Sequence, residues 1–339
     1  MGSEMCIRDR LIGRMRGLKQ VEMVAAEMPA KDVLHITMRP IDGRRFKFQA
    51  GQYLFLQCPQ VSKTEWHPFT ISSSPWEATF SVHIKCRKDM DWAYGIRKLL
   101  TSDAPTNNAR QTLEEKFDRS SKPMVTPALR NSIIAAPGKP LHRSSQGLKS
   151  LKVGHRLYVD GPYGTPSENV THYSVMMLVA AGVGVTPFAS ILKTLAYQAK
   201  NGVLETPLKK VAFFWTCRNA DEFNSFRDIL VGICEDPYLG SIFELNTYLT
   251  GEINLKSVTA NQLYHQYAGR PDWNRVGRRI GEEFPEDDIG VFLCGPMAIA
   301  HQLSTMCKKM NGTPSKVRNP RRMSDAKRPR QFTFFKENF

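Results

Sequence analysis

The sequence predicts two domains, an antiparallel β-barrel followed by an α/β domain with a doubly wound parallel sheet. In the first half, short apolar or alternating segments are separated by Gly, Pro and Ser clusters, as in a small barrel. In the second half, strand patterns alternate with helix patterns, which is typical of a parallel sheet. The 339 residues, of which 41% are hydrophobic, are enough for two domains with separate cores.

The barrel elements come first along the chain. We expect its strands at 21–26, 33–38, 53–57, 69–72, 80–85 and 155–159. A helical stretch at 91–100 interrupts this set. Residues 101–150 are rich in Pro, Ser and Arg without periodicity, which predicts a disordered insertion in a domain spanning 18–160. Residues 1–17 are set aside as a non-native or disordered leader, because they begin with MGSEMCIRDR, which has no fold periodicity.

The second predicted domain spans residues 161–339. Its expected strands are 175–181, 211–216, 243–249, 290–294 and 332–335, and its expected helices are 187–198, 221–234, 272–283 and 297–310. A basic insertion at 312–330 precedes the last strand. The longest apolar run, 174–192, contains two Gly and a Pro near its centre, which favours a strand, a turn and a helix start over a membrane span.

Charge and cysteine content exclude several functional classes. Most of the net charge of +15 lies in 1–20, 101–150 and 312–330, outside the predicted elements, which argues against a nucleic-acid-binding groove. Such basic segments suit an anionic membrane leaflet or a regulatory protein instead. The seven Cys form no CxxC pair, which predicts neither a metal site nor a disulfide scaffold and favours a reducing, cytosolic environment.

A glycine-rich turn follows the first strand of the second domain. Gly182 and Gly184 allow the backbone to come close to a pyrophosphate, whose charge the amides of the next helix would meet. Thr186 opens that helix, and Pro187 suits its first turn because its missing N–H would be unpaired there. The alternative is a plain turn, since a third Gly is missing and no acidic residue ends the next strand to hold a ribose hydroxyl.

Two other positions end parallel strands, where ligands of such sheets bind. Arg218 comes where an adenosine ribose should lie, which favours a 2′-phosphate and therefore NADPH over NADH; the alternative is a solvated surface Arg. Cys294 and Gly295 leave room for a nicotinamide, and the alternative is a buried structural thiol.

In the barrel, the segment WHPFT at 66–70 combines an aromatic ring, a hydroxyl and a His. A flavin needs a plane to lie on, a hydroxyl near N5, and donors for its phosphates. Alternation places His83 and Lys85 on one face of a neighbouring strand, where they would bracket phosphates or form a solvated face. A core aromatic is the alternative for Phe69. No nucleophile–base pair, metal cluster or carboxylate pair is evident, and hydride transfer requires none.

In this order the motifs resemble the ferredoxin–NADP reductase superfamily and, within it, the dehydrogenase domain of NADPH oxidases. The resemblance covers about residues 20–100 and 150–339. It rests on FQAGQY at 48–53, HPFT at 67–70, HIK at 83–85, DGPYGT at 160–165, GVGVTPFAS at 182–190, GRPDW at 269–273, CGP at 294–296 and KENF at 336–339. HPFT differs from the Arg-x-Tyr-Ser/Thr of soluble members, and Lys85 stands where oxidases often have Arg.

The resemblance implies a role for each motif residue. Phe69 would pack on the isoalloxazine of FAD and Thr70 would bond its N5. The residues implied to bind FAD are His67, Pro68, Phe69, Thr70, His83, Ile84 and Lys85. The residues implied to bind NADPH are Gly182, Gly184, Thr186, Pro187, Arg218, Arg270, Cys294, Gly295 and Pro296. Thr70, Cys294 and Phe339 would act at the reacting rings, with Phe339 covering the flavin where nicotinamide must enter.

The resemblance also implies an activity. The chain would be the dehydrogenase portion of a membrane NADPH oxidase, passing hydride from NADPH to FAD and electrons onward to membrane haems that reduce oxygen to superoxide. Haem is expected only in a membrane domain of the same full-length protein, so this portion would lie at the cytosolic face of a membrane. The alternatives are a ferric-chelate reductase dehydrogenase domain and a non-catalytic fragment.

Overall fold

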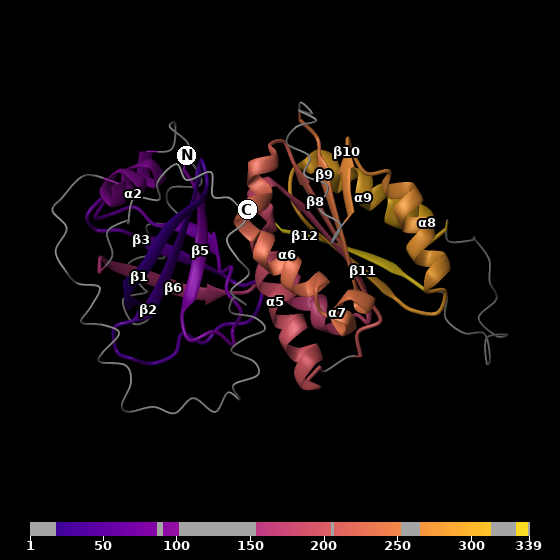
Figure 1. Cartoon of the computed structure of the whole chain (residues 1–339), viewed down its shortest axis with the longest axis horizontal. Helices are drawn as coiled ribbons and strands as arrows, with labels where there is room; N and C mark the ends of the chain where they lie inside the picture. Colours follow the sequence, from indigo (N-terminus) through magenta and orange to yellow (C-terminus); the bar gives the residue numbers. More distant parts are fainter. Residues whose placement is uncertain are drawn as a thin grey trace, which may run out of the picture.

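The structure is a computed structural model that describes residues 18–86, 91–101, 154–204, 207–251, 265–312 and 330–337. A barrel-like antiparallel domain stands beside an α/β domain, and helix α5 (Thr186–Asn201) lies against the barrel (Figure 1). The predicted fold class is therefore confirmed.

The first domain contains one antiparallel sheet with the order β4-β3-β6-β1-β2-β5. Its strands are β1 (Lys19–Ala30), β2 (Val33–Pro40), β3 (Tyr53–Gln57), β4 (His67–Thr70), β5 (Phe80–Lys85) and β6 (Arg156–Tyr163). A bridge between Ile71 and Val82 brings the two edge strands together. Helix α2 (Asp91–Thr101) contributes Trp92, Ile96 and Leu100 to the core of this domain.

Strand β4 lies two residues earlier than the predicted 69–72. Strand β4 ends at Thr70, after which Ile71 bridges Val82 of β5. The Ser72 N–H donates to the Ser81 carbonyl of β5 at 2.8 Å, and the turn that follows is closed by the Glu77 N–H, which donates to the Ser74 carbonyl at 3.0 Å. Strand β4 is therefore shorter at this end than predicted, and the segment after it leads toward the second domain.

The second domain contains a parallel sheet with the order β10-β9-β8-β7-β11-β12. Its strands are β7 (Val175–Ala181), β8 (Lys210–Cys217), β9 (Phe243–Leu249), β10 (His265–Ala268), β11 (Ile289–Cys294) and β12 (Phe332–Lys336). The central strands β7, β8 and β11 are buried almost throughout because helices cover both faces of the sheet. That burial explains why the sequences of these three strands are continuous apolar runs.

Helices and short 3₁₀ turns complete this domain. They are η1 (Pro166–His172), η2 (Gly182–Val185), α5, η3 (Ala220–Phe226), α6 (Arg227–Cys234), α7 (Pro237–Ile242), α8 (Trp273–Glu283) and α9 (Met297–Met310). The apolar run at 174–192 is strand, turn and helix, as predicted. In the described ranges no helix is both long and apolar enough to cross a membrane.

Several sequence expectations for this domain were incomplete, and the short helix α7 was not among the expected helices. The helix expected at 221–234 is two elements, because the backbone of Phe226 leaves the helical region at φ −136°. Strand β10 was not expected, since it has only four residues and is largely exposed at the sheet edge, without a hydrophobic pattern. The predicted insertions at 101–150 and 312–330 fall almost wholly outside the described residues.

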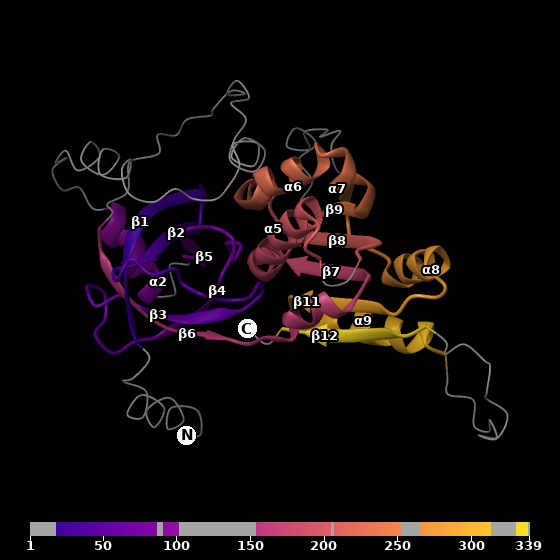
Figure 2. The same cartoon turned by 90° about the horizontal axis from the view of Figure 1, so that it is seen from below.

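The domain interface brings the end of β4 close to the start of α5. The Ser190 Oγ of α5 donates to the Ser73 carbonyl at 2.6 Å, and the hydroxyls of Thr194 and Ser74 lie 3.1 Å apart. Ser190 is fully buried, so this contact is part of the packed interior. Strand β12 ends on the side of the sheet that faces the barrel (Figure 2).

Candidate functional site

The β4 motif forms a layered aromatic cluster with α2. The His67 ring stacks on Trp92 with centroids 4.3 Å apart, and Phe69 stacks on the same indole at 5.7 Å. His67 and Phe69 are half-buried, Pro68 is exposed and Thr70 is buried. The Trp92 Nε1 is buried and has no hydrogen-bond partner among the described residues. An aromatic layer with an unpaired donor and a neighbouring hydroxyl fits a flavin, although Trp92 was not among the predicted site residues.

His83 is enclosed on both faces of its ring. It stacks on His35 at 4.2 Å on one side and meets Phe226 at 4.2 Å, and its Nδ1 lies 2.8 Å from the Ser72 Oγ. Burial holds the pKa of His83 well below its usual value, so the ring is neutral near pH 7. His83 can therefore offer a hydrogen bond to a phosphate but not a charge.

Lys85 supplies the positive charge on this strand. Its Nζ lies 3.7 Å from the Asp32 Oδ2, and its side chain is partly exposed. Ile84, between His83 and Lys85, is buried in the barrel core. The predicted neighbours His83 and Lys85 therefore present different chemistry, a neutral ring and an ammonium group.

The glycine turn of η2 packs directly against the end of β11. A Cβ on Gly184 would lie 2.4 Å from the Cys294 carbonyl oxygen, so only glycine allows this approach. Gly182 has φ +54°, and its carbonyl accepts a hydrogen bond from the Trp215 Nε1 at 3.0 Å. Thr186 and Pro187 are buried at the start of α5. Two motifs far apart in the sequence thus form one surface at the carboxyl edge of the sheet, and that surface fits a dinucleotide.

Cys294 is a buried, neutral thiol at this edge. Burial raises its pKa to about 12, and the nearby Glu337 carboxylate acts in the same direction. Gly295 and Pro296 continue from it into α9, whose first turn begins at Met297. A neutral sulfur next to Gly184 and Gly295 leaves a small surface and adds no charge of its own, which suits a nicotinamide ring.

Glu337 is a buried carboxylic acid that the sequence analysis did not single out. It is 3% exposed, and its Oε1 accepts hydrogen bonds from the Ser167 N–H at 2.8 Å and from the Ser167 hydroxyl. Its Oε2 is buried without a hydrogen-bond partner in the described part of the chain. Burial raises the pKa of Glu337. The only sequence signal was its position in KENF; Phe339 of the same motif lies outside the described residues.

Arg218 and Arg270 are both exposed, at the carboxyl ends of β8 and β10. The strand between them, β9, ends against Arg218, because a Cβ on Gly251 would lie 2.2 Å from the Arg218 carbonyl oxygen. Both guanidinium groups are free of ion pairs with described residues. The two predicted arginines therefore belong to one edge of the sheet.

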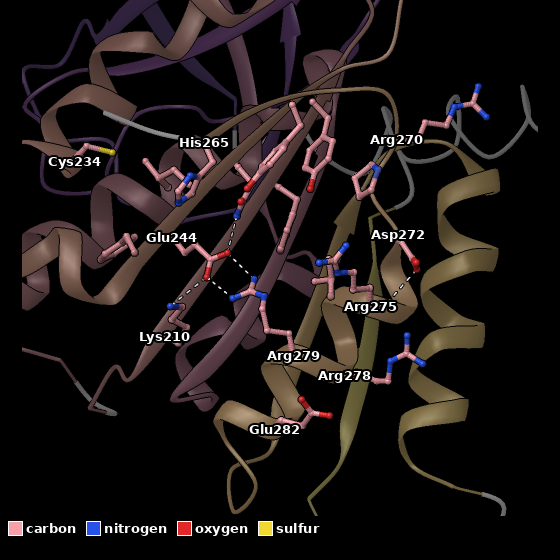
Figure 3. A pocket seen from close by; sticks show the side chains of 18 of the residues that line it. Lys210, Cys234, Glu244, His265, Arg270, Asp272, Arg275, Arg278, Arg279 and Glu282 are labelled. Carbon is pink, nitrogen blue, oxygen red and sulfur yellow. Dashed lines mark hydrogen bonds and ion pairs between the residues drawn. The ribbon is translucent and has the colours of Figure 1, made fainter. Parts of the chain in front are cut away.

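Arg270 also stands at the rim of a groove of about 1140 Å³ between β9, β10 and α8 (Figure 3). Tyr248 and Tyr267 stack there with centroids 4.8 Å apart. Deeper in the groove, burial opposes ionisation of Glu244, but hydrogen bonds led by those from Arg279 lower its pKa to about 2. Arg279 is therefore held by Glu244, whereas Arg270 is exposed and has no ion pair with a described residue. No cluster of three or more metal-ligating side chains occurs within the described ranges.

Comparison with known protein families matches both halves of the chain. The FAD-binding domain family matches residues 18–167, and the ferric reductase NAD binding domain family matches residues 173–308. The division between these two matches lies between β6 and β7, where the antiparallel sheet gives way to the parallel one.

Curated relatives cover the same region. The chain is 32% identical to a superoxide-generating NADPH oxidase heavy chain of Dictyostelium discoideum over 88% of this chain and 52% of that protein. It is 31% identical to human NADPH oxidase 3 over 88% of this chain and 47% of that protein. The chain thus spans about half the length of the curated relatives it matches.

Solved structures show the same fold. A ferredoxin NADP+ reductase from Neisseria gonorrhoeae with bound FAD and NADP superposes with a TM-score of 0.56 at 12% identity, covering 94% of this chain and 98% of that one. A flavohemoglobin from Malassezia yamatoensis gives a TM-score of 0.53 at 17% identity, covering 96% and 63%. Both alignments extend over more than nine tenths of this chain and therefore include both of its domains.

Proposed function

The chain belongs to the ferric-reductase-like dehydrogenases of the NADPH oxidase family, and from this premise we propose that it transfers hydride from NADPH to FAD and passes the electrons onward to haems of a membrane domain. Those haems would reduce oxygen to superoxide, and the membrane domain would belong to the same full-length protein. A position at the cytosolic face of that membrane is part of the same proposal.

One observation carries the proposal. The Ser190–Ser73 hydrogen bond joins the first turns of α5, which follow the glycine turn, to the loop that follows Thr70. A nucleotide on the glycine turn and a flavin on β4 would thus share one interface. Hydride transfer depends on such closeness of two rings more than on any acid or base.

The side chains have separable roles in this reaction. Bound FAD and NADPH supply the hydride acceptor and donor. On the flavin side, Phe69 gives the aromatic surface, the Thr70 hydroxyl a hydrogen bond near N5, and Lys85 a charge for the phosphates. His67 and the neutral His83 add donors on the same domain.

On the nucleotide side, Gly182 and Gly184 admit the pyrophosphate to the backbone, and Arg218 with Arg270 attracts the adenosine 2′-phosphate. Cys294, as a neutral thiol, leaves room for nicotinamide without adding a charge beside the ring. We also propose Phe339 as an aromatic cover of the flavin that leaves when nicotinamide enters.

A second candidate is a ferric-chelate reductase dehydrogenase domain, favoured by the ferric reductase family match at 173–308. The two candidates share every step up to the reduced flavin and differ in the final acceptor. Regulatory proteins or anionic lipid are proposed partners of the basic insertions at 101–150 and 312–330.

Purified protein with added FAD tests the shared step. We expect NADPH-dependent bleaching of the flavin absorbance and reduction of an artificial electron acceptor, with no superoxide above the free-flavin background. Haem-independent superoxide well above that background would contradict the proposal that oxygen is reduced at the membrane haems. Absence of any NADPH-dependent flavin reduction would contradict the function itself.

A further inference from the structure

The carboxylate of Glu222 lies against the glycine turn. Its Oε2 is 3.2 Å from the position that a Cβ on Gly182 would take. The side chain is half-buried and makes no ion pair with a described residue. The pKa of the Cys217 thiol, at the end of β8, is raised mainly by burial and further by the negative charge of Glu222. A carboxylate that has no ion-pair partner among the described residues therefore lies between the end of β8 and the glycine turn.

Packing, not charge attraction, puts Glu222 there. Its neighbours Phe223 and Phe226 in η3 are buried and meet the Trp215 ring edge-on at 5.0 and 6.0 Å. The same Trp215 donates its Nε1–H to the Gly182 carbonyl at 3.0 Å. One indole thus fixes both the glycine turn and the 3₁₀ turn that presents Glu222 to it.

A carboxylate in this place has defined chemistry toward a pyridine nucleotide. In open parallel sheets the coenzyme binds at the carboxyl ends of the strands, and an acid beyond the second strand accepts a hydrogen bond from the adenosine ribose 2′-hydroxyl. When that hydroxyl carries a phosphate of about −1.5 to −2 charges, the same carboxylate repels it. Arg218, which is exposed and lies four positions earlier at the same end of β8, acts in the opposite sense.

We propose that Glu222 is a coenzyme-selectivity residue, which accepts a ribose hydroxyl of bound NADH and opposes the 2′-phosphate of NADPH that Arg218 attracts. The inference rests on the proposed hydride transfer from a pyridine nucleotide and names a determinant of which nucleotide is used. Its consequence is that the wild-type chain keeps measurable NADH use and discriminates less strongly for NADPH than Arg218 alone would allow.

Glu222→Gln tests this, because it removes the charge and preserves the shape. The dissociation constants of NADP⁺ and NAD⁺ are measured by isothermal titration, with kcat/KM for both reduced coenzymes as a second readout. We expect NADP⁺ to bind on the order of tenfold more tightly, the effect of removing one charge several Å from a phosphate, and NAD⁺ to bind more weakly. Glu222→Ala should move the ratio in the same direction.

Asp221→Asn is the matched control, since Asp221 is the adjacent, exposed carboxylate of the same 3₁₀ turn. It should leave the NADP⁺ to NAD⁺ ratio unchanged. An unchanged ratio in folded Glu222→Gln, or an equal shift in Asp221→Asn, would overturn the inference while leaving the proposed function intact. A wild-type protein that binds neither nucleotide would overturn both.

Discussion

Gly184 offers the sharpest test of how the nucleotide site is built. In Gly184→Ala the new methyl group would lie 2.4 Å from the Cys294 carbonyl oxygen, a distance that must open beyond 3.0 Å. The obstacle is backbone at the end of buried β11, so no side chain can simply rotate away. We expect a loss of about 1–3 kcal/mol of unfolding free energy, typical of overpacking, which lowers Tm by roughly 2–12 °C in a domain of this size.

The same displacement should disturb the reaction. Because η2 would move away from β11, the surface for nicotinamide would open, and flavin reduction by NADPH should slow. Gly232→Ala is the control: apart from its chain neighbours and its own helix backbone, no atom lies within 4 Å of the added Cβ. Gly232 lies in helix α6, where Ala stabilises relative to Gly by about 0.5–1 kcal/mol. Thermal unfolding and stopped-flow flavin reduction measure both effects. If Gly184→Ala matched the wild type in Tm and in reduction rate, the reasoning would be wrong.

Two further predictions concern charge. Arg218→Ala should weaken transition-state binding of NADPH relative to NADH by roughly 1.5–3 kcal/mol, the loss of a charge-assisted hydrogen bond, as measured by kcat/KM for both coenzymes; equal losses would assign Arg218 to structure. For Glu337, the folded-state pKa is raised, so its contribution to stability is present below the ordinary pKa of Glu and lost as pH rises through the raised value. Urea unfolding across that window should show wild-type stability falling relative to Glu337→Gln, and parallel curves for the two proteins would contradict this.

Much of the fold could be predicted because the information is local. Strands β7, β8 and β11 are covered on both faces, and this burial appears in the sequence as uninterrupted apolar runs. The glycine turn and Pro187 likewise mark the start of α5 by their own backbone preferences. Strand β10 and the break at Phe226 escaped prediction, because an exposed four-residue edge strand and a single dihedral change leave no periodic pattern.

The order of the two domains and the strand and helix periods followed from the sequence alone, and so did the motif residues proposed for each cofactor. Which of these residues meet became visible only in the folded chain. Folding joined Ser167 to Glu337 across 170 positions, set Gly184 against Cys294, covered His83 with Phe226 and placed Glu222 at the turn where no acid had been expected. The physical reason is that periodicity reports the environment of one segment, whereas charge, pKa and close approach at a site depend on neighbours that packing brings from distant parts of the chain.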